Sequence, residues 1–205
     1  MIVFCDLRCF LSSRHSPTGR DARGRFIMTL VPAKMTRDTT LVRERPDIML
    51  RFSIWATRIL SRNPYFQVLG CCIAETFADF SAWDQMKLSS AFSFGMMRKT
   101  FHFSQKCMAY RLGGIHVVNQ PWSMSALWFL VKPFMSAKMK SRVHLLGDDH
   151  DALYAHAPRA SLSADFGGTA EEDPMWFLDQ GIALEAAASA RHIALEAAAV
   201  SSVAQ

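Results

Sequence analysis

The stretch YRLGGIHVVNQPWSMSALWFLVKPFMSAKMKSRVHLLG, residues 110–147, decides the fold. Its β-branched run at residues 115–118 is typical of a strand, and an Asn-Gln-Pro sequence ends that strand because proline disfavours helix in the residue before it. Residues 122–131 then predict a helix, and Lys-Pro separates this helix from a second helical segment at residues 135–140. Residues 142–146 predict another strand, closed by a glycine.

The first of these helices has no polar face. Between Trp122 and Val131, only Ser123 and Ser125 interrupt a run of apolar residues. A helix that is apolar around nearly its whole circumference is either buried on all sides or meets protein on one side and lipid on the other. The sequence leaves both arrangements open.

Charge is distributed unevenly along the chain. Nine cations and no acid lie between Asp84 and Asp148, whereas residues 148–205 carry two cations and ten acids. A block that is both basic and apolar indicates an anionic lipid surface. A basic and polar block would have indicated nucleic acid, which we do not expect as a partner. The alternative is a solvated basic face over an ordinary core helix.

Length and composition bound the remaining choices. A chain of 205 residues, half of them hydrophobic, is long enough for one core with a small appendage. No run of about 18 uncharged apolar residues occurs, so no transmembrane helix is expected. Five cysteines without framework spacing favour reduced thiols and a cytoplasmic setting. Cys5, Cys9 and His15 lack a second ligand pair, so no metal is expected.

Further elements are predicted on either side of the central stretch. Strands are expected at residues 26–31 and 66–74, the latter an almost continuous apolar run that suits a strand buried on both faces. Helices are expected at residues 47–61, capped by Asp47, and at residues 88–108. Alternating strands and helices predict an α/β domain whose sheet is largely parallel, with flanking helices.

The C-terminal region contains an eleven-residue repeat. GIALEAAASAR at 181–191 is followed by HIALEAAAVSS at 192–202, and alanine with leucine favours helix strongly. An eleven-residue period fits three helical turns. We expect an Ala-rich helical tail.

Catalytic motifs are missing from the sequence. It contains no glycine-rich phosphate loop and no nucleophile elbow. Glu75 and Asp79, at helical spacing, form only a weak acid–base candidate. His116 and His144 alternate with apolar residues in predicted strands, which favours hydrogen-bonded structural histidines. We therefore expect neither an enzyme nor a cofactor.

Five stretches, taken together, resemble the CRAL-TRIO lipid-binding family, in particular the branch of alpha-tocopherol transfer protein, cellular retinaldehyde-binding protein and the clavesins. They appear in the family's order and are GRDARGRFIMTLVPAKM at 19–35, FQVLGCCIAETFADF at 66–80, YRLGGIHVVNQPW at 110–122, KPFMSAKMKSRVHLLG at 132–147 and LSADFGGT at 162–169. The resemblance implies a sheet that forms the floor of an apolar cavity. It also implies that the segment from Pro121 to about Lys140 is a mobile helical gate over that cavity.

The resemblance implies two sets of site residues. One set binds a phosphoinositide headgroup beside the gate and comprises Arg111, Lys138, Arg142 and Lys132. The other set lines the lipid pocket or the gate, with a place in the plain core as the alternative for each, and comprises Phe92, Phe103, Trp122, Leu127 and Phe129. The expected partners are therefore a small hydrophobic lipid (tocopherol-, retinoid- or phosphoinositide-like) and an anionic phosphoinositide membrane surface, which the protein would visit transiently from the cytoplasm.

Three departures from the family accompany the resemblance. Residues 1–17 do not resemble the helical domain that normally comes first, so we expect a leader at 1–17, a CRAL-TRIO domain at 18–179 and the tail at 180–205. Gly113 stands where the family has a second basic position, and Ser163 where it has a proline. The expected function is binding and transfer of a hydrophobic lipid. The alternative is a truncated module that senses phosphoinositide or binds a partner.

Overall fold

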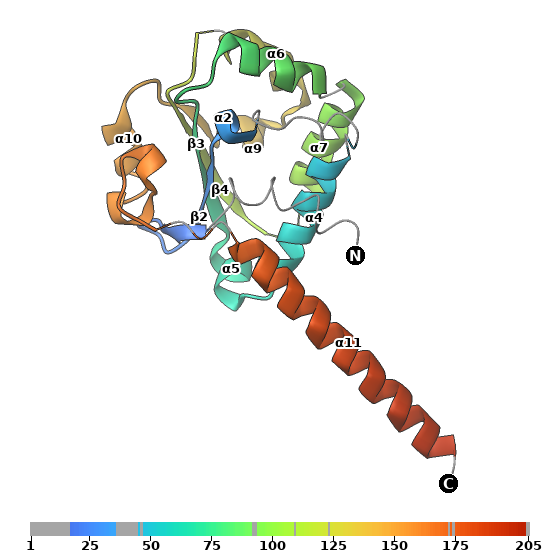
Figure 1. The fold of residues 1–205 in the computed structure, drawn as a ribbon. Helices are drawn as coiled ribbons and strands as arrows, with labels where there is room; N and C mark the ends of the chain where they lie inside the picture. The colour runs from blue at the N-terminus through green and yellow to red at the C-terminus, as the bar shows by residue number, and fades with distance from the viewer. Residues whose placement is uncertain are drawn as a thin grey trace.

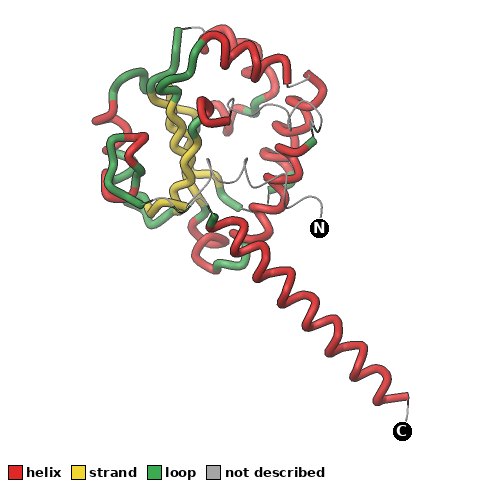
Figure 2. Tube along the Cα trace, viewed as in Figure 1, coloured by secondary structure: helices red, strands yellow, loops and turns green. Residues whose placement is uncertain are grey.

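A five-stranded sheet organises the computed structural model, which describes residues 17–35, 45, 47–91, 94–108, 110–122, 124–171, 173 and 175–203 (Figures 1 and 2). The strands follow one another across the sheet in sequence order. The first strand pairs antiparallel with the second, and the other three pairings are parallel. The strands are β1 (Pro17–Arg20), β2 (Phe26–Leu30), β3 (Cys71–Thr76), β4 (Leu112–Val118) and β5 (Val143–Leu145). The expected α/β class with a largely parallel sheet is confirmed.

Strand order determines where the helices lie. Parallel neighbours joined in sequence by right-handed crossovers place every crossover on the same face of the sheet. Figure 1 agrees, since α4, α6, α7 and α9 all lie on one side, which we call the crossover face. The connecting helices are α2 (Pro32–Met35), α4 (Ile48–Leu60), α5 (Pro64–Leu69), α6 (Ala82–Ala91), α7 (Phe94–Lys106), α8 (Met124–Val131), the 3₁₀ turn η1 (Lys132–Phe134) and α9 (Ala137–Lys140).

The stretch that directly follows β5 covers the opposite face, which we call the α10 face (Figure 1). It consists of α10 (His150–Tyr154) and the 3₁₀ turns η2 (Arg159–Ser161) and η3 (Ala164–Phe166). Its core joins strand residues to these short elements, and five of its members have no exposed surface: Ile27, Val118, Leu153, Leu162 and Phe166. Alternating strand residues point to opposite faces, so Met28 and Cys71 belong to a different core, against α4 and α5.

The C-terminal helix α11 (Trp176–Val203) confirms the predicted helical repeat. Leu178, near its start, is buried in the core that α4 contributes to. The helix then extends away from the sheet and its flanking helices (Figures 1 and 2). Ile182, Ile193 and Leu195 are exposed along it. The domain boundary expected at residue 180 stays a prediction.

The expected strand at residues 66–74 is wrong over its first half. Asn63 accepts hydrogen bonds from the backbone of Tyr65 and Phe66, and Pro64 occupies the first helical turn, so α5 forms there. Gly70 ends the helix with a φ of 77°, and β3 begins only at Cys71. An apolar run does not distinguish a short buried helix from a strand.

Two helix predictions need correction as well. Asp47 precedes α4 as expected, but its side chain does not cap the helix and instead pairs with Arg51 and, at 3.7 Å, with Arg45. The expected helix at 88–108 corresponds to two elements, α6 and α7. The first of them begins earlier than expected, at Ala82. Residues 92–93 between them lie outside the described residues.

The proposed carboxylate pair is not on a helix. Glu75 lies in β3, and Asp79 follows in a turn with a φ of 58°. The helical spacing that suggested an acid–base pair therefore has no structural basis. No helix in the part of the chain that the structure describes is long and apolar enough to cross a membrane.

Candidate functional site

The segment between β4 and β5 starts at a turn held by Asn119. Its φ of 55° is a left-handed conformation that asparagine tolerates better than most residues. Asn119 Nδ2 donates to Thr76 Oγ1 at 2.9 Å, and its Oδ1 lies 3.1 Å from His150 Nε2. Its backbone N–H donates to the carbonyl of Gly147 at 2.7 Å. One residue thus ties the turn to β3, to α10 and to the loop after β5.

Gln105 on α7 holds the other end of the segment. Its Nε2 donates to the carbonyl of Phe134 at 2.8 Å, and its Oε1 accepts from the backbone N–H of Ser136 at 2.7 Å. Ser136 in turn caps α9 by accepting from the backbone N–H of Met139. Sequence reasoning missed Gln105, because a glutamine near the end of a helix carries no distinguishing pattern.

Between these two attachments, two apolar side chains are exposed, one just before α8 and one on it. Trp122 is 90% exposed and Phe129 is 80% exposed. Met124, in contrast, packs against the core of Phe77, Phe80 and Val117. The helix without a polar face therefore meets protein on one side and presents apolar surface on the other. Exposed apolar surface of this kind is a feature of sites that bind membranes or other apolar partners.

The structure describes only some of the predicted lipid-contact residues. Phe103 is half-buried on α7, whereas Phe92 and the side chain of Leu127 lie outside the described part. Trp122 and Phe129 are exposed and do not line any of the cavities described below. Their role in a lipid pocket stays a prediction.

Three of the four predicted headgroup residues surround one cavity. The cavity has a volume of about 490 Å³ and all its charged lining residues are cations, namely Arg111, Lys138 and Arg142. We call it the basic pocket. Lys132 is exposed on η1 and does not line it, and neither does Lys140. The remaining lining residues are Ser104, Gln105, Met108, Tyr110, Leu112, Ser136 and Met139.

Backbone geometry positions the two arginines at one edge of the sheet. The carbonyl of Arg111 accepts from Cys71 N at 2.9 Å, and the carbonyl of Arg142 accepts from Ile115 N at 2.7 Å. Each arginine thus directly precedes one of two neighbouring parallel strands. A side chain at Gly70 would lie 1.9 Å from the carbonyl oxygen of Arg111, so only glycine allows this close approach.

The cations of the basic pocket are not neutralised by nearby acids. Among the ion pairs found between described residues, none involves Arg111, Lys138 or Arg142. Burial also raises the pKa of the Tyr110 phenol in the lining, which therefore stays uncharged. The arrangement can attract a multiply charged anion.

A second cavity extends the positive surface. It has a volume of about 300 Å³ and is lined by Arg98, His102 and Lys106 of α7 together with the η1 turn. Gln105 and Ser136 line both cavities, so the hydrogen bonds of Gln105 lie between them. The cationic surface therefore continues along α7 beyond the basic pocket.

A model of the CRAL/TRIO domain family matches residues 15–168. The chain belongs to the CRAL/TRIO family. This family of lipid-binding and transfer domains is the one that the sequence motifs indicated, so the resemblance is confirmed.

The CRAL/TRIO assignment is supported by individual relatives. The chain is 29% identical to Clavesin-1 of Rattus norvegicus over 150 residues, covering 73% of this chain and 40% of that protein. It is 31% identical to Clavesin-2 of Homo sapiens over 149 residues, covering 72% of this chain and 43% of that protein. The chain thus spans less than half the length of these curated relatives.

The CRAL/TRIO fold is also found in a solved structure. The crystal structure of Sfh5 superimposes with a TM-score of 0.54 at 12% sequence identity, covering 71% of this chain and 50% of that one. At this identity the likeness concerns the fold alone. It supports the mixed α/β architecture with a mostly parallel sheet.

Proposed function

We propose that this CRAL/TRIO domain binds a small hydrophobic lipid and transfers it between membranes, and that the basic pocket holds a phosphoinositide headgroup during membrane contact. One observation carries the proposal. An apolar helix, attached to the domain at both ends, lies in the segment that ends at Arg142, beside a cavity whose charged lining residues are all cations. The segment from Pro121 to about Lys140 would act as the gate.

Transfer of this kind makes and breaks no covalent bond. The driving force is removal of apolar surface from water, which contributes about 25 cal/mol per Å². A ligand with a long isoprenoid or acyl chain gains several kcal/mol in this way, enough for micromolar affinity. Trp122 and Phe129, exposed on the gate, would enter the lipid interface when the domain docks, and the cations would orient the domain on an anionic surface.

Lipid extraction is the direct experiment. The purified protein would be extracted with organic solvent and the extract identified by mass spectrometry, and exchange of the identified lipid between vesicles would then be measured. Copurification of one lipid class and its accelerated exchange are expected. Protein that is reproducibly empty and takes up no tocopherol, retinoid or phosphoinositide would sink the proposal. Vesicle binding without exchange would instead favour a phosphoinositide sensor.

Charge reversal at the basic pocket tests the headgroup assignment separately. Lys138→Glu combined with Arg142→Glu should weaken binding to phosphoinositide vesicles more than tenfold. Each nearby cation contributes about 1 kcal/mol at an anionic surface, and reversal adds repulsion. Lys140→Glu is the matched control, since Lys140 lies on the same helix but does not line the pocket.

The outcome of charge reversal is read by vesicle sedimentation and far-UV circular dichroism. The double variant should keep its helical spectrum, because the pocket cations lack ion pairs with other described residues. Uptake of an apolar ligand from detergent should survive. Equal vesicle binding by the parent and the double variant at low salt would place the headgroup site elsewhere.

A further inference from the structure

Three histidines meet on the α10 face of the sheet. His116 of β4 and His144 of β5 are register partners, and their rings stack with centroids 5.0 Å apart. His156, just after α10, stacks against both, at 4.4 Å from the ring of His116 and 5.7 Å from that of His144. None of the functions discussed above uses this cluster.

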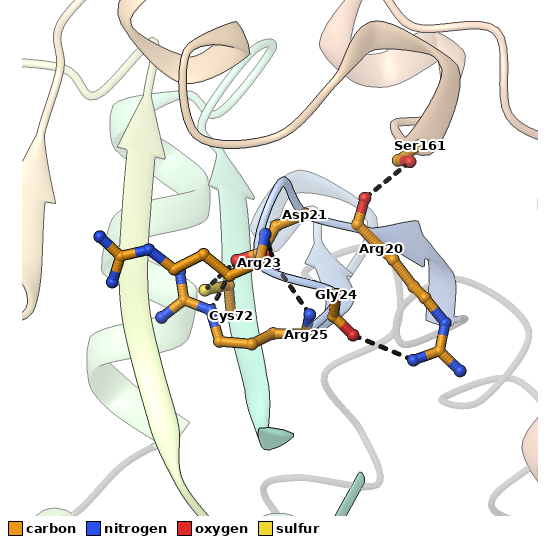
Figure 3. A network of polar contacts seen from close by, with 7 residues as sticks. All are labelled: Arg20, Asp21, Arg23, Gly24, Arg25, Cys72 and Ser161. Carbon is orange, nitrogen blue, oxygen red and sulfur yellow. Dashed lines mark hydrogen bonds and ion pairs between the residues drawn. The ribbon is translucent and has the colours of Figure 1, made fainter. Parts of the chain in front are cut away.

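The turn between β1 and β2 completes a cavity around these rings. The cavity has a volume of about 250 Å³, and its charged lining residues besides the histidines are Asp21, Arg23 and Arg25. Figure 3 shows the side chains of Arg23 and Arg25 extending to the same side of the turn, toward β4. We call this cavity of about 250 Å³ the histidine cavity. It shares no lining residue with the basic pocket.

The single carboxylate of the cavity is fully engaged. Asp21 Oδ1 accepts from the backbone N–H groups of Arg23 and Arg25, at 2.9 and 2.8 Å. Its Oδ2 accepts from Arg25 Nε at 2.6 Å and lies 3.5 Å from Cys72 Sγ. Burial opposes ionisation of Asp21, yet the hydrogen bonds from Arg25 and Arg23 keep its pKa below the usual value. Arg25 therefore balances Asp21, and Arg23 remains as surplus positive charge.

Glycine lets the Arg25 guanidinium reach the histidines. A Cβ at Gly113 would lie 1.9 Å from Arg25 Nη1, so the guanidinium lies directly against the backbone of β4. Among the described residues, its hydrogen bonds use Nε alone, which leaves the terminal amino groups available to a ligand. The paired fork geometry of such groups suits phosphate oxygens.

His116 provides an independent observation that points to a ligand. The residue is 4% exposed and lines the cavity, yet its Nδ1 has no hydrogen-bond partner among the described residues. Buried polar atoms are nearly always bonded in native structures. Burial, followed by the neighbouring His156 and His144, lowers the pKa of His116 to about 4. A bound anion would satisfy this imidazole and favour its protonated form.

We propose that the histidine cavity binds a phosphate group, either as inorganic phosphate or within a phosphomonoester. Arg23, Arg25 and the three imidazoles supply donors around a volume of suitable size. A metal ion fits less well, because nearly parallel rings cannot all aim a nitrogen lone pair at one point, whereas the separate oxygens of a phosphate can accept from different rings. Within the described ranges, no group of three or more potential ligands could hold a metal ion.

The groups that face the histidine cluster leave a surplus of positive charge around it. Asp21 stays ionised and paired with Arg25, and burial raises the pKa of Cys72 to about 11, so Cys72 remains a neutral thiol. Arg23 and Arg25 outnumber the single carboxylate, which favours an anionic ligand.

Calorimetric titration of the full chain with inorganic phosphate tests the site. The titration is made at about pH 6 and at about pH 8, and the parent should bind phosphate at both values. Arg23→Gln and His156→Ala should each weaken binding about tenfold at the lower pH, since each removes a single donor at an exposed position. Arg62→Gln, an exposed arginine distant from the cavity lining, should bind as the parent does.

Imidazole nitrogen NMR identifies where phosphate binds. Added phosphate should shift the His116 signals in the parent and in the Lys138→Glu and Arg142→Glu variant, which separates this site from the basic pocket. Absence of phosphate binding at both pH values would overturn the proposal. So would unchanged affinity in Arg23→Gln and His156→Ala, or zinc uptake that depends on the histidines without any binding of phosphate.

Two further arms distinguish the source of the phosphate group. A soluble phosphomonoester such as glycerol phosphate that binds the parent and loses affinity in Arg23→Gln, while phosphatidic acid vesicles do not bind, would indicate a free metabolite. Vesicle binding that requires phosphatidic acid and is lost in Arg23→Gln would indicate a lipid headgroup. Both results support the site and differ only in the origin of its ligand.

Discussion

The two faces of the sheet use the same strands in different ways. On the α10 face, Ile27, Val118 and Phe166 are completely buried beneath short 3₁₀ turns. On the crossover face, Met28 and Cys71 are buried against α4 and α5, but Ile73 and Ile115 are only partly buried and the basic pocket opens at the edge. Alternate residues of the strands thus belong to two different cores. Both cores hold the fold together, and the crossover face is less tightly covered where Ile73 and Ile115 lie.

The two faces also differ in the elements that cover them. The α10 face is covered by one continuous stretch that is fastened at several points. Tyr154 Oη donates to the carbonyl of Phe166 at 2.9 Å, and Ser161 Oγ donates to the carbonyl of Arg20 at 2.9 Å. The crossover face is covered by longer helices, such as α4 and α7. The Asn119 and Gln105 hydrogen bonds hold the two ends of the segment over its far edge.

The largest expected effect breaks the packed face. Phe166→Ala should destabilise the domain by about 3 to 5 kcal/mol, because it removes a fully buried ring and leaves a cavity in a close-packed core. Urea unfolding followed by circular dichroism gives the free energy of unfolding. A loss in the free energy of unfolding below about 1 kcal/mol would mean that the α10 face tolerates voids and is not the more closely packed of the two faces.

The two faces should also respond to pH with opposite signs. His116, on the α10 face, has a pKa of about 4 in the folded state, below its ordinary 6.5. The unfolded chain therefore binds the proton first, and stability falls as pH drops from 6.5 toward 4, by up to about 3 kcal/mol. Glu75, whose neighbours along β3 place it on the crossover face, has a pKa raised by burial to about 7, from 4.5. Its contribution is present below 4.5 and is lost as pH rises toward 7.

Two amide variants separate these contributions. His116→Gln should flatten the acid limb of the stability profile, and Glu75→Gln should flatten the fall in stability between about pH 4.5 and 7. Chemical denaturation across this range measures both, and each variant is the control for the other. Profiles that change in the same direction would remove the proposed contrast between the faces.

Much of the fold was accessible from sequence because its signals are local. The β-branched run of β4, the proline after it and the apolar α8 each specify their own conformation. The parallel sheet then follows from connection rules. The error at residues 66–74 has an equally local cause, since the cap by Asn63 and the left-handed Gly70 outweighed an apolar pattern shared by helix and strand.

The candidate sites were accessible only in part. The convergence of Arg111, Lys138 and Arg142 was expected from the family resemblance, because motif positions carry spatial information that spacing alone does not. His116 and His144 were expected in strands, but not that they stack with a third ring or that Nδ1 of His116 lacks a partner among the described residues. His156 is contributed by a distant part of the chain, and no pattern in the sequence links it to β4.

The smallest expected effect on stability concerns the gate. Phe129→Ala should change the free energy of unfolding by less than about 0.5 kcal/mol, because the ring is 80% exposed and alanine favours helix. Under the proposed function, lipid transfer between vesicles should nevertheless slow about tenfold. An inserted phenylalanine ring contributes on the order of 1.5 to 3 kcal/mol when it leaves water for the membrane interface.

Ile193→Ala is the matched control for Phe129→Ala. Ile193 is 65% exposed, but it lies on the projecting helix α11 and not on the gate. Its loss should leave both stability and transfer unchanged if membrane contact is confined to α8. Equal slowing by the two variants would mean that any exposed apolar residue serves membrane contact. A destabilisation by Phe129→Ala above about 1 kcal/mol would show instead that the ring packs into the domain in solution, which would make the crossover face as closed as the α10 face.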